Sequence, residues 1–114
     1  MKILIIGFGS IGARHFEVLS GLYPGADISI VSAHSEHKNV KFDVLDKVPD
    51  LGSYDYYVIA SETSLHVEQL RRIDAAAHGK KILVEKPLYK KPSDFKPANN
   101  EVFVGYNLRY HPLV

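Results

Sequence analysis

The chain has 114 residues, which is enough for one compact domain and too few for two. Apolar residues make up 46% of the sequence and charged residues 24%, proportions that are ordinary for a soluble globular fold. A net charge of +1 without a large basic stripe argues against a nucleic-acid partner, and the lack of cysteine excludes disulfides and thiolate metal sites.

The amino-terminal stretch MKILIIG combines a short apolar run with a glycine. Four apolar residues before the glycine are too few for a signal peptide or a membrane span, and this absence leads us to expect a cytoplasmic protein without a membrane partner. A continuous apolar run is typical of a parallel strand that is covered on both faces. We therefore predict the first strand at Lys2–Ile6.

Two helices are predicted from apolar residues at helical spacing. The first spans Ser10–Leu22 and ends at the turn-forming pair Pro24-Gly25. The second runs to about Ala77, is closed by Gly79, and has three candidate N-caps, Ser61, Thr63 and Ser64.

Further strands alternate with these helices. Runs rich in Val, Ile and aromatic residues predict them at Asp27–Ser32, Asn39–Val44, Tyr54–Ala60, Lys81–Val84 and Glu101–Tyr106. The linkers before the third and sixth strands are short, so we expect reduced helices there. The alternation implies right-handed crossovers, and we predict one α/β domain over residues 1–114 with a Rossmann-type, doubly wound parallel sheet of about six strands.

The stretch GFGSIGARH places three glycines, Gly7, Gly9 and Gly12, between the first strand and the first helix. In a Rossmann fold the first permits a tight turn, the second lets the backbone approach a pyrophosphate, and the third lets the helix pack closely. Free backbone N–H groups and the positive end of the helix attract the anion. The G-x-G-x-x-G spacing is weak evidence alone, but its position between a strand and a helix predicts a bound dinucleotide.

No carboxylate follows the second strand, where NAD-binding proteins use one to hold the two ribose hydroxyls. Ser32, Ser35 and Lys38 are candidate donors to the 2′-phosphate of NADP, and His34 is a candidate neighbour of the adenine. A solvated loop is the alternative for this segment. For a cofactor written as NAD(P), the pattern slightly favours NADP.

Three further stretches carry a family resemblance: ASETSLHVEQL at 60–70, GKKILVEKPL at 79–88 and VGYNLRYHP at 104–112. With GFGSIGARH, they make the chain resemble the glucose–fructose oxidoreductase/inositol dehydrogenase family, written Gfo/Idh/MocA. The triplet Glu85-Lys86-Pro87 is the most specific signal. The resemblance implies an NAD(P)-dependent oxidoreductase acting on sugars, polyols or related compounds.

The resemblance also implies residue roles. Lys86 would be catalytic, reaching the substrate hydroxyl and stabilising the developing alkoxide, whereas an exposed strand-end lysine is the alternative. Arg14 and His15 either face the crevice or form an exposed pair. On the substrate side we expect Lys86, Tyr106, Asn107 and Arg109. The cofactor-binding residues that we predict are Gly7, Phe8, Gly9, Ser10, Ile11, Gly12, Ser32, His34, Ser35, Ser61, Thr63, His66 and Glu85. For Thr63 the alternative is a capping role alone, and for His66 it is a position that faces solvent.

The chain departs from the family pattern at its end, because Val114 stands where the second, substrate-binding domain of the family would begin. We therefore expect a dinucleotide-binding domain that is inactive alone and meets a sugar-like molecule only with a second domain. The alternative is a free-standing NAD(P)-binding module with a structural or regulatory role. Reduced helices would leave one sheet face thinly covered, which would favour a homo-oligomer or another partner.

Overall fold

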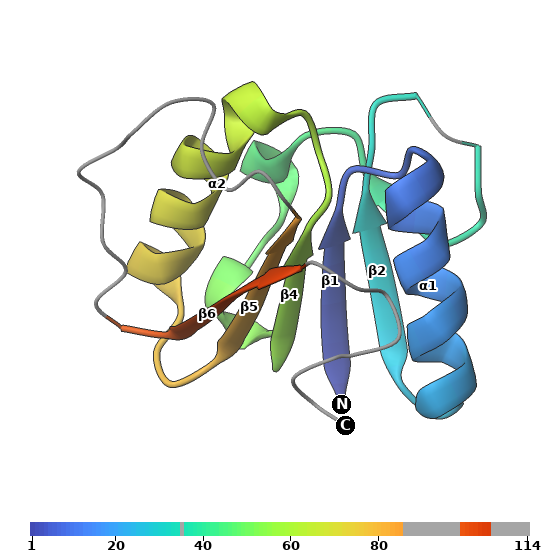
Figure 1. Ribbon diagram of the computed structural model, residues 1–114, viewed down its shortest axis with the longest axis horizontal. Helices are drawn as coiled ribbons and strands as arrows, with labels where there is room; N and C mark the ends of the chain where they lie inside the picture. Colours follow the sequence, from blue (N-terminus) through green and yellow to red (C-terminus); the bar gives the residue numbers. More distant parts are fainter. Residues whose placement is uncertain (35, 86–98, 106–114) are drawn as a thin grey trace.

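The computed structural model describes residues 1–34, 36–85 and 99–105, which form one parallel sheet between helices (Figure 1). These described residues contain two α-helices, α1 (Ser10–Leu22) and α2 (Thr63–Ala76), and two short 3₁₀ turns, η1 (Leu45–Lys47) and η2 (Leu51–Ser53). The strands are β1 (Lys2–Ile6), β2 (Asp27–Val31), β3 (Val40–Phe42), β4 (Tyr56–Ile59), β5 (Lys81–Glu85) and β6 (Glu101–Gly105).

All six strands are parallel and lie in the order β3-β2-β1-β4-β5-β6. The chain moves outward from β1 through α1 to β2 and β3, then returns to the other side of β1 with β4. The strand order therefore reverses between β1 and β4, which is where ligands bind in open α/β sheets. The predicted doubly wound sheet of six strands is confirmed.

The two faces of the sheet carry separate apolar clusters, because side chains alternate along each strand. On β1, Ile3 and Ile5 pack with Leu19 of α1, whereas Leu4 and Ile6 belong to the cluster that contains Leu70 of α2. All six side chains are at most 2% exposed. Helices thus cover both faces (Figure 1), which explains why β1 is apolar from Ile3 to Ile6.

The segment between β2 and β3 has no helix in its described part, as its short length predicts. It is held by an aromatic contact instead. The His37 ring lies 5.0 Å from the ring of Phe8 and 4.8 Å from that of Phe16, and His37 Nδ1 accepts a hydrogen bond from the Asn39 N–H at 3.1 Å. The missing helix is thus replaced by an imidazole packed against α1 and the loop before it.

Several predicted boundaries are wrong. Strand β3 has only three residues, and β4 begins at Tyr56 rather than Tyr54. The N-cap of α2 is Glu62, in an extended conformation and without a side-chain capping bond, so none of the three predicted residues caps this helix. Neither described helix has the length and apolar character needed to cross a membrane.

A buried carboxylate joins the end of α2 to the chain before β6. Asp74 is 5% exposed. Its Oδ1 accepts hydrogen bonds from the Asn99 N–H at 3.1 Å and from Asn100 Nδ2 at 3.0 Å, while its carbonyl oxygen accepts one from Asn99 Nδ2 at 2.8 Å. These bonds fix the entry of β6, whose only partner in the described sheet is β5.

We predict that Asp74→Ala lowers the free energy of unfolding by about 2 kcal/mol, because removing a buried charged acceptor leaves its donors unpaired. Urea denaturation followed by circular dichroism measures this change. The exposed Asp27 at the start of β2 offers a matched control. An Asp74→Ala protein as stable as Asp27→Ala would contradict a structural role for the Asp74 network.

Candidate functional site

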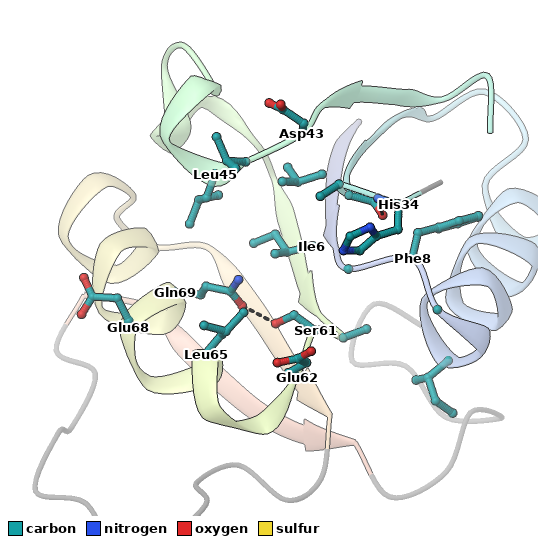
Figure 2. Close-up of a pocket in the computed structure, with 18 of the residues that line it drawn as sticks. Ile6, Phe8, His34, Asp43, Leu45, Ser61, Glu62, Leu65, Glu68 and Gln69 are labelled. Carbon is teal, nitrogen blue, oxygen red and sulfur yellow. Dashed lines mark hydrogen bonds between the residues drawn. The ribbon is translucent and has the colours of Figure 1, made fainter. Parts of the chain in front are cut away.

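A cavity of about 790 Å³ opens at the carboxyl edge of the sheet, beside the point where the strand order reverses. Figure 2 shows it between the glycine loop and the first turns of α2. The residues that line it are Ile6, Gly7, Phe8, Gly9, Ser10, Ile11, Val31, Ser32, Ala33, His34, Asp43, Val44, Leu45, Asp46, Ala60, Ser61, Glu62, Leu65, Glu68, Gln69 and Arg72. Its wall is largely apolar, with charged groups from the segment after β3 and from α2.

Backbone contacts hold the glycine loop in place. Gly7 has φ of +91°, a left-handed conformation that favours glycine, and its N–H donates to the Val31 carbonyl at 2.8 Å. A Cβ on Gly7 would lie 2.7 Å from Ser61 Cα, and a Cβ on Gly12 would lie 2.2 Å from the Gly7 carbonyl oxygen. The loop can therefore pass between β4 and α1 only if both positions are glycine.

Gly9 differs from its two neighbours in the motif. Its φ of −76° is open to any residue, and a Cβ placed on it would meet nothing within 4 Å. Gly9 also lines the cavity. The fold itself therefore does not require a glycine at position 9. The open space where a Cβ would lie is what a ligand would need in order to approach the backbone.

The first turn of α1 presents its backbone to the same cavity. Gly9 is the N-cap of α1 and makes no side-chain capping bond, and the first turn contains no acidic residue. Ser10 and Ile11 line the cavity. A helix start with uncapped N–H groups carries a partial positive charge, which attracts anions such as a pyrophosphate.

The residues that line the cavity near the end of β2 agree only in part with the residues predicted there from the sequence. Ser32 and His34 line it as predicted, while Lys38 does not; Ser35 lies outside the described residues. Two carboxylates from the segment after β3, Asp43 and Asp46, also line the cavity. Neither was predicted from the sequence, because the Rossmann pattern places the acidic residue at the end of β2.

Two predicted residues near α2 have different positions. Ser61 lines the cavity, and its Oγ donates to Gln69 Oε1 (dashed in Figure 2). His66 is 2% exposed, and its Nε2 donates to the Ser61 carbonyl at 2.8 Å. It does not face solvent, and it is not among the lining residues; it supports the loop that is. Thr63 is the first residue of α2.

Glu85 and His15 meet at the opposite end of the same sheet edge. His15 is 1% exposed, and its Nε2 donates to Glu85 Oε1. The alternative of an exposed Arg14–His15 pair is therefore wrong for His15, whereas Arg14 is exposed. Glu85 is 17% exposed and is not among the lining residues. Burial, followed by the charges of Tyr23 and Glu85, raises the pKa of nearby Tyr56.

The remaining predicted site residues, Lys86, Tyr106, Asn107 and Arg109, lie outside the described residues. Within the described ranges, no group of three or more His, Asp and Glu side chains is placed to hold a metal ion. The described site is thus a glycine loop, a helix start and an apolar cavity with acidic groups along its rim.

A family model described as "Oxidoreductase family, NAD-binding Rossmann fold" matches residues 1–101. Its short name is GFO_IDH_MocA. No protein with a curated description matches the chain in sequence.

Among solved structures, the WlbA dehydrogenase from Bordetella pertussis, in complex with NADH and UDP-GlcNAcA, has a TM-score of 0.66 at 21% identity, over 80% of this chain and 30% of that one. A probable dehydrogenase from Thermotoga maritima has a TM-score of 0.63 at 23% identity, over 78% and 29%. Apo scyllo-inositol dehydrogenase from Lactobacillus casei has a TM-score of 0.59 at 20% identity, over 80% and 29%. These likenesses show the fold, and the matched part spans about 30% of each relative's length.

The glycine geometry generates a prediction about stability. Gly12→Ala should lower the free energy of unfolding by at least about 2 kcal/mol, because the new Cβ overlaps a backbone carbonyl. Gly9→Ala should stay within about 1 kcal/mol of the wild type, since its conformation and surroundings accept a methyl group. Urea denaturation of both variants tests the contrast, and equal destabilisation would refute it.

Proposed function

Because the chain belongs to the Gfo/Idh/MocA oxidoreductase family, with its NAD-binding Rossmann fold, we propose that residues 1–114 form the dinucleotide-binding domain of an NAD(P)-dependent oxidoreductase. We further propose that the complete enzyme acts on a sugar, a polyol or a sugar derivative. The observation that carries the proposal is the glycine loop, which lines a cavity at the switch point between β1 and β4.

The pyrophosphate would bind at this loop. Gly9 leaves room for close approach, and the uncapped start of α1 supplies N–H donors and a positive partial charge. The adenosine would extend toward β2 and β3, where the apolar side chain of Val44 is exposed in the cavity wall. The nicotinamide half would extend the other way, past Ser61 toward the end of β5.

Lys86 is the catalytic residue in this proposal. In the sequence it directly follows Glu85, the last residue of β5, and Val84 of this strand pairs with Ile59 of β4, so β5 ends at the carboxyl edge of the sheet. The nicotinamide ring, when bound, supplies the hydride acceptor. An ammonium group beside the substrate hydroxyl would stabilise the developing alkoxide. Glu85 would then serve the cofactor side by holding His15 and, through it, α1.

The substrate side would come largely from a second domain. The solved relatives are more than three times as long as the segment matched here, and we propose that Tyr106, Asn107 and Arg109 lead toward such a domain. Hydride transfer needs the substrate carbon held at about 3–3.5 Å from the nicotinamide. Because residues 1–114 provide one wall of the crevice, we expect no useful turnover from them alone.

Binding of a dinucleotide is the first test. Calorimetry with NADH and NADPH should show binding by residues 1–114, and Gly9→Ala should weaken it at least about tenfold, because a methyl group would fill the space for the pyrophosphate. Gly21→Ala is a matched control, since a Cβ there also meets nothing within 4 Å and Gly21 does not line the cavity. Absence of heat with both nucleotides would sink the proposal.

Catalysis is tested in a protein that carries both domains. Lys86→Ala should lower kcat by about 10²–10⁴-fold while the dissociation constant of the cofactor changes little, as expected for a positioned acid–base group. Lys86→Arg should rescue poorly, because the guanidinium is bulkier and keeps its proton. Lys80→Ala, before β5 at the far edge of the sheet, is the control. A kcat within about threefold of the wild type would assign catalysis elsewhere.

A further inference from the structure

The segment after β3 brings a carboxylate to the place where β2 lacks one. Val31, the last residue of β2, pairs with Phe42, and the Ser32 N–H donates to the Phe42 carbonyl at 3.0 Å. Asp43 therefore comes directly after the residue whose carbonyl accepts the Ser32 N–H, on the strand next to the end of β2. Both residues line the cavity. The acidic group missing from the end of β2 is thus present on the neighbouring strand.

Two cations near this edge, Lys47 and Arg72, are paired with acids. Lys47 Nζ lies 3.1 Å from Asp43 Oδ1, and the hydrogen bond from Lys47 holds the pKa of Asp43 below its ordinary value. Arg72 of α2 contacts Asp46 Oδ1 through its Nη1. Lys47 and Arg72 are therefore engaged by carboxylates of the same segment.

The charge of the cavity wall is negative. Of the lining residues that the structure describes, four carry carboxylates, Asp43, Asp46, Glu62 and Glu68, while Arg72 has the only permanently cationic side chain. Figure 2 shows Asp43 on the opposite side of the cavity from Glu62. A 2′-phosphate would bring further negative charge to this end.

Lys38, the cation that the sequence offered for a 2′-phosphate, lies elsewhere. It precedes β3, and the neighbouring Asn39 donates through Nδ2 to the carbonyl of Ile28, near the start of β2. The cofactor edge begins at Ser32, at the other end of that strand. Lys38 is accordingly absent from the cavity wall.

We propose that this edge selects NAD over NADP, with Asp43 as the specificity-determining residue. The inference rests on the proposed dinucleotide function and revises the preference for NADP that the end of β2 suggested. Asp43 accepts hydrogen bonds from the ribose hydroxyls of NAD and repels a 2′-phosphate. Asp46 contributes by holding Arg72 away from any phosphate. The ribose recognition that usually comes from the end of β2 is here provided one strand further out.

The test compares the dissociation constants of NADH and NADPH for wild-type residues 1–114, Asp43→Asn and Asp46→Asn. The wild type should bind NADH at least about tenfold more tightly, because like charges within a Debye length repel. Asp43→Asn should lower the ratio of the NADPH dissociation constant to the NADH dissociation constant at least about fivefold, since it removes a repulsive charge and frees Lys47. Asp46→Asn should strengthen NADPH binding by freeing Arg72.

Asp27→Asn is the matched control. It makes the same change of charge at the opposite edge of the sheet, where β2 begins, and should leave the ratio unchanged. Asp43 is 58% exposed, so its substitution should leave the fold intact, which circular dichroism checks. A wild-type preference for NADPH, or an equal ratio in Asp43→Asn and Asp27→Asn, overturns the inference while the dinucleotide function stands. Binding of neither nucleotide to the wild type would overturn both.

Discussion

A close backbone approach lies at the end of β1, and the rest of the site depends on it. Gly7 passes so near the start of the loop after β4 that a Cβ would fall 2.7 Å from Ser61 Cα, and the first turn of α1 sits directly on Gly7 through Gly12. This approach fixes where α1 begins and directs its first turn toward the cavity. Without it, the N–H groups of that turn would not face the switch point.

Buried histidines from both helices hold the walls of the crevice. His15 joins α1 to the end of β5 through Glu85, and His66 joins α2 to the loop after β4 through the Ser61 carbonyl. Buried polar groups are costly unless they are hydrogen-bonded, so each pair favours one arrangement of its helix. The helices are therefore anchored at the edge where the cofactor would bind, in addition to their apolar packing on the sheet.

The sequence was sufficient for the parts of the fold that local pattern controls. The bounds of β1 and α1 agree with prediction because an apolar run, a glycine turn and a helical stripe follow one another without interruption. The N-cap of α2 was not predictable in this way, since three hydroxyl side chains lie around the start of the helix and Glu62 caps it without using a side chain. The length of β3 depends on its pairing with β2, which shifts register between Ile30 and Val31.

Less of the site than of the fold could be predicted from the sequence, because several of its groups are brought together only by tertiary contacts such as strand pairing. Nothing in the local sequence places Asp43 beside Ser32; that follows from the pairing of Val31 with Phe42. Likewise, His15 and Glu85 are 70 residues apart in the chain, so their contact has no local signal. The glycine loop was predictable because its turn and its close backbone contacts require glycine at Gly7 and Gly12.

The central claim, that the glycine loop and the edges beside it bind a dinucleotide, is tested most directly by an NMR titration. ¹⁵N-labelled residues 1–114 would be titrated with NADH while the backbone amide shifts are followed. We expect the largest changes at Gly9, Ser10 and Ile11, with smaller ones at Ser32 and Ser61, and little change at the far edge near Asp27 and Lys81. Shifts confined to that far edge, or no shifts at saturating nucleotide, would contradict the claim.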